Sequence, residues 1–582
     1  MAPLLNISIS SNLQFFPAFI LILILILFPC RSAATTSEAE ALLKWKNSLH
    51  NPTNHSLLPS WNLLPSYNST SSSTNSSHSS CFQWIGIVCN EFGSVTEINL
   101  TSSNLKGTLQ YFNFSSFPNL LSFVLNGNSL YGSIPSQISN LTRLTHLDLG
   151  WNQLSGNIPF EIGMLVCLEV FWAHNNNLSG AIPVSIGNLS SLTFLALEEN
   201  KIFGAIPEEV GQLHSLMVLY LYDNNLSGTI PSSIGNLSKL SYLALQENKI
   251  SGSIPKEVGQ LSSLMVLYFY GNYLSGSIPS SIGNLSKLSN LALSTNNITG
   301  SIPKEVGQLS SLKELYLYKN HLSGSIPSLI GNLSKLSYLA LEENKISGSI
   351  PKEVGQLSSL MQLYLYRNYL SGSIPSSIGN LSKLSNLSLS TNNLTGFIPE
   401  KVGELSSLMV LYLYENHLSG SIPSTIGNLS KLSDLELGFN NINGSIPKEV
   451  GQLSSLKRLS LSSNHISGSI PSSIGNLTNL EVFEIYDNSL TDYLPENICL
   501  GGKLKRSVGN LLKLGFMDLS NNKLVGKLSK NWGQCPNLTI LNISNNKISG
   551  RLPIEIGKAT QLRILDLSSN LLVGKSLKNG ES

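Results

Sequence analysis

Residues 216–231 read LMVLYLYDNNLSGTIP, and close copies of this stretch recur along most of the chain. The copies share the pattern L-x-x-L-x-L-x-x-N-x-L-x-G-x-I-P, whose asparagine returns every 24 residues. The unbroken series consists of Asn128, Asn152, Asn176, Asn200, Asn224, Asn248, Asn272, Asn296, Asn320, Asn344, Asn368, Asn392, Asn416, Asn440, Asn464 and Asn488. An earlier unit has Ser103 in the asparagine position, and later units follow at Asn522, Asn546 and Asn570. This fixed period predicts an α/β repeat solenoid with short parallel strands on its concave face.

The alternation within one copy predicts which side chains face the interior. Along a strand successive side chains point to opposite faces, so we expect Leu216, Leu219 and Leu221 to point inward and Tyr220 and Tyr222 outward. One unit alone cannot bury its leucines, whereas stacked units bury them against one another.

Three further residues of the copy have a structural explanation. The Asn224 amide can bond backbone groups where the chain turns away from the strand, which predicts an asparagine ladder. Gly228 suits a turn that needs positive φ, and Pro231 fixes φ at an edge. These residues are therefore interpreted as scaffold.

The ends of the chain and its composition limit the function classes. The 582 residues carry a net charge of only +2 without basic clusters, which argues against nucleic-acid binding. Residues 1–34 are predicted to be a secretory signal peptide, because the apolar stretch 15–28 is shorter than a membrane-spanning helix and small residues follow it. The segment lacks Lys and Arg before its apolar stretch, so an uncleaved anchor stays the alternative. No second apolar stretch has spanning length.

Cysteines and sequons favour an extracellular compartment. Cys81 and Cys89 lie close together after an export signal, which favours a disulfide between them. Eight N-L-S or N-L-T sequons recur every 48 residues, and if they are glycosylated that face must meet solvent. These glycosylation candidates are Asn140, Asn188, Asn236, Asn284, Asn332, Asn380, Asn428 and Asn476.

The L-x-G-x-I-P end of each unit and the region before the units carry a family resemblance. Residues 38–45 (EAEALLKW), Trp61 and residues 81–89 (CFQWIGIVC) resemble the N-terminal cap of plant leucine-rich-repeat receptor-like kinases, in the subgroup with alternating G-N-L-S-K-L and G-Q-L-S-S-L units. The resemblance implies a plant-type leucine-rich-repeat superhelix whose first repeat is covered by a short helix and a disulfide. The expected organisation is a cap at 35–94, repeats at 95–498, an irregular junction at 499–511, three further repeats at 512–577 and a tail at 578–582.

Two places depart from this family pattern. The interval between Asn488 and Asn522 is 34 residues and contains the sequence CLGGKLKR from Cys499, which looks like a join after an internal deletion. A bond between Cys499 and Cys535 is left open there. In the last unit, we expect Leu565, Leu567 and Leu572 to lie near an exposed end of the stack.

The outward strand positions hold the candidate ligand-binding residues. Tyrosine pairs recur every 48 residues, and between them stand smaller or polar residues such as Ala244 with Gln246 and Ala340 with Glu342. The pairs are Tyr220 and Tyr222, Tyr268 and Tyr270, Tyr316 and Tyr318, Tyr364 and Tyr366, and Tyr412 and Tyr414. Such a row suits an extended peptide, because tyrosine offers apolar area and a hydroxyl. Tandem duplication would copy the same tyrosines without any ligand, and that alternative stays open.

Residues that break the period are the other candidates. Arg367 and Arg458 can hold a peptide carboxylate, or they are solvated surface charges. Gly574-Lys575-Ser576 lacks the first glycine of a phosphate loop, and no kinase motif, metal-ligand spacing or cofactor-binding motif is found.

We therefore expect a non-enzymatic extracellular recognition module of a receptor-like kinase or receptor-like protein. Its expected partners are a secreted peptide or protein and a leucine-rich-repeat co-receptor kinase. An enzymatic role is expected only if the gene continues into a kinase after residue 582. The alternative is a secreted inhibitor of a cell-wall polysaccharide hydrolase.

Overall fold

The computed structural model describes residues 33–50, 57–62, 84–495, 511 and 513–574. They form two compact units, residues 1–179 and 180–582, which are treated separately below. Residues 1–32 of the predicted signal peptide, Cys81 and Cys499 lie outside the described residues.

Unit 1 begins with a helix that covers its first coil. In helix α2 (Ala33–Ser48), Trp45 is fully buried, donates from Nε1 to the carbonyl of Thr108 at 3.0 Å and lies edge-on to Phe112. Trp61 is also fully buried, and its ring stacks on that of Trp84 with the centroids 5.3 Å apart. These aromatic side chains shield the apolar interior of the first coil from water.

The strands of unit 1 belong to two sheets. The main sheet contains β1 (Ile87–Cys89), β2 (Val95–Asn99), β4 (Ser122–Val124), β6 (His146–Asp148) and β8 (Val170–Trp172). A smaller side sheet contains β3 (Lys106–Gly107), β5 (Ser129–Gly132), β7 (Gln153–Asn157) and β9 (Asn177–Ser179). Strand β1 runs antiparallel to β2, and all later pairs are parallel.

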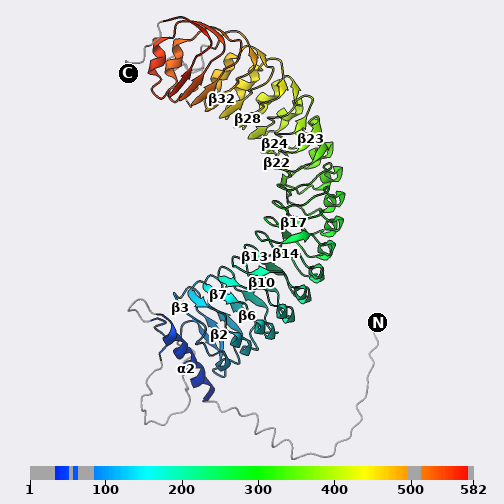
Figure 1. Cartoon of the computed structure of the whole chain (residues 1–582), viewed down its shortest axis with the longest axis vertical. Helices are drawn as coiled ribbons and strands as arrows, with labels where there is room; N and C mark the ends of the chain where they lie inside the picture. Colours follow the sequence, from blue (N-terminus) through cyan, green and yellow to red (C-terminus); the bar gives the residue numbers. More distant parts are fainter. Residues whose placement is uncertain (1–32, 51–56, 63–83, 496–510, 512, 575–582) are drawn as a thin grey trace, which may run out of the picture. The chain divides into compact units, whose positions relative to one another are not determined.

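Unit 2 repeats the parallel pairing in constant register. Its strands in the main sheet are β10 (Phe194–Ala196), β12 (Val218–Tyr220), β14 (Tyr242–Ala244), β16 (Val266–Tyr268), β18 (Asn290–Ala292), β19 (Glu314–Tyr316), β20 (Tyr338–Ala340), β22 (Gln362–Tyr364), β24 (Asn386–Ser388), β26 (Val410–Tyr412), β28 (Asp434–Glu436), β30 (Arg458–Ser460), β32 (Val482–Glu484), β34 (Phe516–Asp518), β36 (Ile540–Asn542) and β38 (Ile564–Asp566). Small side sheets of two or three short strands are formed by β11 (Phe203–Gly204) and β13 (Asn225–Leu226), β15 (Ser251–Ser253) and β17 (Tyr273–Ser275), β21 (Ser347–Ser349), β23 (Tyr369–Gly372) and β25 (Asn393–Leu394), β27 (Ser419–Gly420) and β29 (Asn441–Ile442), β31 (Ser467–Gly468) and β33 (Ser489–Leu490), and β35 (Val525–Lys527), β37 (Lys547–Gly550) and β39 (Leu571–Leu572). Within unit 2 the strands of the main sheet follow the inner side of the bend, and the helical turns lie on the outer side (Figure 1). The expectation of short parallel strands on a concave face is confirmed.

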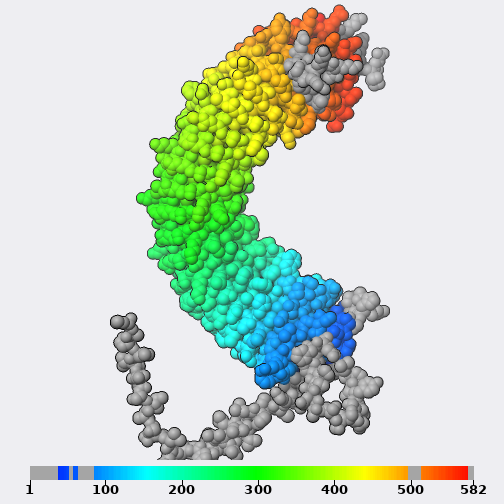
Figure 2. Space-filling view, turned by 180° about the vertical axis from the view of Figure 1, so that it is seen from behind, coloured from blue at the N-terminus to red at the C-terminus, as the bar shows by residue number. Residues whose placement is uncertain are grey.

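The interior of the coils matches the predicted alternation. Leu216, Leu219 and Leu221 are at most 1% exposed, whereas Tyr220 and Tyr222 are half-buried on the concave, solvent-facing surface of the sheet. The coils of unit 2 pack into a continuous surface (Figure 2). The helical segment of each repeat is a short 3-10 turn rather than an α-helix, as in η7 (Ser232–Asn236) and η8 (Lys256–Gln260).

The predicted asparagine ladder is present. The Asn224 carboxamide accepts a hydrogen bond from the Ile202 amide of the preceding coil at 2.9 Å. Its Nδ2 donates to the carbonyls of Leu197, Leu221 and Tyr222 at 3.0–3.2 Å. One side chain therefore satisfies four backbone groups in two coils, which would otherwise be buried without partners.

The turns around the ladder have the predicted backbone. Gly228 has φ +74° and Pro231 has φ −66°. The residue before each ladder asparagine also adopts positive φ even where it is large, as in Arg367 (φ 51°) and Phe439 (φ 55°). Non-glycine residues pay about 1 kcal/mol for this conformation, which the ladder bonds offset.

The ladder continues across the predicted junction at 499–511. Although ten extra residues intervene, β32 pairs with β34 in parallel register, and Asn522 accepts the amide of Leu490 at 3.0 Å. At the last coil Leu565 is 36% exposed and Leu567 and Leu572 are half-buried, which confirms that this end of the apolar interior is less covered.

Glycines in the 3-10 turns set the distance between coils. A Cβ on Gly259 would overlap the carbonyl oxygen of Ser281 in the next coil, whereas a Cβ on Gly557 would have nothing within 4 Å. The two glycines occupy the same position of their turns, η8 and η19 (Ile554–Lys558).

We therefore predict that Gly259→Ala destabilises the fold by about 2 kcal/mol, because the coils must separate to admit the methyl group. The matched control Gly557→Ala is expected to change stability by less than about 0.5 kcal/mol. Urea denaturation followed by circular dichroism measures both. Equal stability of the two variants would show that contact at this turn does not set the coil spacing.

Candidate functional site

The ten predicted tyrosines lie on the concave, solvent-facing surface of the unit 2 sheet. They come from β12, β16, β19, β22 and β26 or the residues just after these strands, and all ten are half-buried. Within four of the pairs the ring centroids are 6.0–6.5 Å apart: Tyr220 with Tyr222, Tyr268 with Tyr270, Tyr364 with Tyr366 and Tyr412 with Tyr414. The structure thus brings the predicted tyrosines onto one surface.

The residues between the pairs are buried. Ala244, Ala292 and Ala340 are at most 4% exposed, and Gln246 and Glu342 are 7% exposed. Solvent therefore barely reaches the side chains that stand between the tyrosine pairs.

Two tyrosines missed by the sequence interpretation join the row. The Tyr338 ring lies 4.7 Å from that of Tyr316 and 5.6 Å from that of Tyr364, so three consecutive coils are in aromatic contact. Tyr242 occupies the same strand position two double repeats earlier. The available signal was a tyrosine at the first outward position of both strands. It does not recur every 48 residues, because Asn290 stands between the two tyrosines and Asn386 follows Tyr338 at the next equivalent position.

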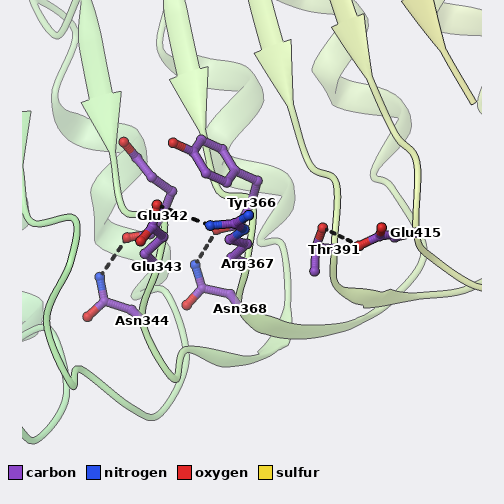
Figure 3. A network of polar contacts seen from close by, with 8 residues as sticks. All are labelled: Glu342, Glu343, Asn344, Tyr366, Arg367, Asn368, Thr391 and Glu415. Carbon is purple, nitrogen blue, oxygen red and sulfur yellow. Dashed lines mark hydrogen bonds and ion pairs between the residues drawn. The ribbon is translucent and has the colours of Figure 1, made fainter.

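Glu342 is the most unusual charged group of this surface. Burial raises the pKa of its carboxyl group to about 7, the nearby Glu343 raises the pKa further, and Lys319 lowers it. The side chains of Glu342 and Tyr366 extend in the same direction from neighbouring coils, away from the ladder residues Asn344 and Asn368 (Figure 3). Burial and Glu342 together raise the pKa of Tyr366 to about 12, so this phenol stays protonated and able to donate.

The two candidate arginines have carboxylate neighbours. Arg367 is 64% exposed and lies 3.7 Å from Glu343 of the preceding coil (Figure 3). Arg458 lies between Glu436 at 3.5 Å and Glu484 at 3.7 Å, one on each adjacent coil. The charge of Arg458 is thus already balanced, whereas the exposed Arg367 is paired among the described residues with the half-buried Glu343, and an ion pair with one exposed member is weak in water.

Other predicted features occupy different surfaces. The eight candidate glycosylation asparagines are all exposed, and each is the last residue of a 3-10 turn, from η3 (Ser136–Asn140) to η17 (Ser472–Asn476). Cys89 and Cys535 each take part in a disulfide bond, and Cys167 is free. The pairing of Cys89 with Cys81 stays a prediction, because Cys81 lies outside the described residues. Among the described residues, no group of His, Cys, Asp and Glu could hold a metal ion and no helix is long and apolar enough to cross a bilayer.

Sequence families match both the cap and the repeats. A leucine rich repeat N-terminal domain matches residues 35–90, a leucine-rich repeat region matches 218–324 and 315–418, and leucine rich repeat models match 143–165, 167–189, 406–466 and 537–559. Arabidopsis thaliana Receptor-like protein kinase 7 is 35% identical over 148 residues, which are 25% of this chain and 14% of the kinase. MDIS1-interacting receptor like kinase 2 from the same plant is 39% identical over 117 residues, which are 20% of this chain and 10% of the kinase.

Solved structures match over most of the chain. The plant peptide hormone receptor RGFR1, in complex with RGF2, is 35% identical with a TM-score of 0.70, covering 84% of this chain and 83% of the receptor. The Arabidopsis receptor kinase HAESA, in complex with the peptide hormone IDA and the co-receptor SERK1, is 34% identical with a TM-score of 0.74, and the match covers 92% of this chain and 90% of the HAESA chain. This chain belongs to the plant leucine-rich-repeat receptor family.

The family assignment confirms the resemblance inferred from the sequence. The relatives are named as kinases, but this leucine-rich-repeat receptor chain matches them only in the repeat region, over 9–16% of their length. Its described part is a receptor ectodomain without a kinase fold.

The raised pKa of Glu342 gives the receptor chain a pH-dependent stability. The folded pKa is about 7 and the ordinary value is 4.5, so the folded state holds the proton more tightly and loses stability as pH rises from about 5 to above 7. We predict that Glu342→Gln is more stable than the unsubstituted protein by about 2 kcal/mol at pH 8 and equally stable at pH 5.

Thermal or urea unfolding of both proteins at the two pH values measures this difference. Glu38, whose pKa burial also raises to about 7, titrates alike in both and cancels in the comparison. A stability difference between the proteins that is the same at pH 5 and pH 8 would contradict a buried, titrating Glu342.

Proposed function

We propose that this chain is the extracellular ligand-binding module of a plant receptor and that it binds an extended secreted peptide along the tyrosine row of unit 2. The observation that carries the proposal is the row itself: half-buried aromatic rings project from consecutive coils of one sheet. Similar folds with peptide hormones bound, RGFR1 with RGF2 and HAESA with IDA, support it.

The dimensions of the row suit a peptide. Eight strand-to-strand steps separate β12 from β26, which at about 4.8 Å each gives a span of about 38 Å. A fully extended peptide covers that span with about eleven residues. The rings offer apolar area with few rotatable bonds, and their protonated hydroxyls can bond a peptide backbone.

Arg367 is the better candidate for a ligand carboxylate. Its guanidinium is exposed and its ion pair with Glu343 is long, so exchanging Glu343 for a ligand group costs little. Arg458 would have to give up contacts with both Glu436 and Glu484. We propose that Arg458 instead links three adjacent coils.

A co-receptor and an extracellular location complete the proposal. HAESA is described with the co-receptor SERK1, and a leucine-rich-repeat co-receptor kinase is the proposed second partner here. The exposed sequon asparagines on the 3-10 turns fit glycosylation of an exported chain, on a surface apart from the tyrosine row.

The tyrosine row is tested by binding a library of secreted plant peptides to the purified chain and then substituting pairs of tyrosines. We predict that Tyr268→Ala with Tyr270→Ala, and separately Tyr364→Ala with Tyr366→Ala, weaken a bound peptide at least tenfold, about 1.4 kcal/mol or more.

Tyr273 and Tyr369 provide the matched control. Both are 57% exposed and lie in the small side sheets, on β17 (Tyr273–Ser275) and β23 (Tyr369–Gly372), away from the row. Tyr273→Ala with Tyr369→Ala is expected to change affinity less than twofold. Equal losses in both sets of variants, or none in either, would remove the proposed binding surface.

A further inference from the structure

Glu342 is a buried carboxylate that lacks a full set of hydrogen bonds. The residue is 7% exposed, and its Oε2 is buried without a hydrogen-bond partner among the described residues. Ionised carboxylates that are removed from water normally have a paired charge or several donors. A hydrogen bond with its own backbone lowers the pKa of the Glu342 carboxyl group, but the described residues leave Oε2 without a partner.

Three tyrosines, Tyr338, Tyr364 and Tyr366, interact electrostatically with the Glu342 carboxylate, and the ring of Tyr316 contacts that of Tyr338. We call these four tyrosines the tyrosine cluster. Consecutive ring centroids in it lie 4.7, 5.6 and 6.5 Å apart. Glu342 contributes to raising the pKa of Tyr338, Tyr364 and Tyr366, which shows that its charge acts on all three rings. Ala340, fully buried, adds no bulk between them.

We propose that the tyrosine cluster and Glu342 form a subsite for a cationic side chain, that of arginine or lysine, in the peptide ligand. This inference rests on the proposed function and specifies the ligand chemistry at one place in the row. Aromatic faces attract cations, and a carboxylate behind them supplies the opposite charge. The cation reaches Glu342 when a covering tyrosine ring rotates aside.

The surrounding charges are compatible with a cation. The carboxylates that act on this site are Glu342, Glu343 and Glu314, and the cations are Lys319 and Arg367. Arg367 is paired with Glu343. The site is therefore negative by about one charge when Glu342 is ionised.

A proton competes with the cation for Glu342. The carboxyl group titrates near pH 7 in the free chain, so binding is strongest above pH 7 and weakens below it. Burial raises the pKa of Tyr338, Tyr364 and Tyr366, so these phenols stay protonated through this range.

The chain contains its own neutral version of the subsite. Gln246 stands at the position equivalent to Glu342, with Tyr242 and Ala244 on its strand and Tyr268 and Tyr270 on the next coil. It is buried to the same 7% exposure. Glutamine is thus compatible with this environment, and Glu342→Gln is expected to fold.

The test measures binding of small probes by NMR titration of the full chain. The probes are N-acetylarginine amide, N-acetyllysine amide and the uncharged N-acetylcitrulline amide, each at pH 8 and pH 5.5. At pH 8 we expect at least one cationic probe to bind tenfold more tightly than citrulline, and Glu342→Gln to abolish that preference. At pH 5.5 the preference should fall at least tenfold in the unsubstituted chain.

A second pair of variants separates the aromatic contribution from folding. Tyr338→Phe keeps the ring and should retain the cation preference, whereas Tyr338→Leu should weaken it at least threefold. Equal binding of arginine, lysine and citrulline, or an unchanged preference in Glu342→Gln, would overturn the subsite. If these probes fail while the tyrosine-pair variants still lose a peptide, only the subsite is wrong; if the probes succeed and no peptide binds, the proposed function is wrong.

Discussion

The side-chain amide of the ladder asparagine is the interaction on which each unit depends. Asn224 and Asn320 each accept one backbone N–H from the preceding coil and donate to carbonyls of both coils. These bonds satisfy the backbone where it leaves the strand, at a depth that water does not reach. Because the turn is fixed there, the leucines point inward and the next outward side chains are presented to partners.

Because of this constraint, the inward residues maintain the fold while the outward residues are free to serve ligand binding. The inward positions hold apolar residues, mostly leucine, whereas the outward strand positions accept tyrosine, alanine, glutamate or arginine without disturbing the pairing. A recognition surface can therefore change coil by coil on an unchanged framework. The tyrosine row and Glu342 are local consequences of that freedom.

Much of the fold followed from the sequence because its determinants are local and repeated. The strand alternation around Leu219, the role of Asn224 and the positive φ of Gly228 each depend on one unit and its immediate neighbour. The ring contacts of Tyr338, the burial of Glu342 and the two carboxylates around Arg458 were not predicted. They depend on how far side chains from adjacent coils reach across the sheet, which a period in the sequence does not specify.

The most direct test of the ladder as the central constraint is hydrogen exchange of the Asn320→Ala variant. The amide of Ile298 donates to Asn320, and that of Ile442 donates to Asn464, six coils further along. We predict a large loss of protection at Ile298 and in the adjoining coils, with Ile442 unchanged. Unchanged protection at Ile298, or an equal loss at Ile442, would contradict a structure held together coil by coil through its asparagines.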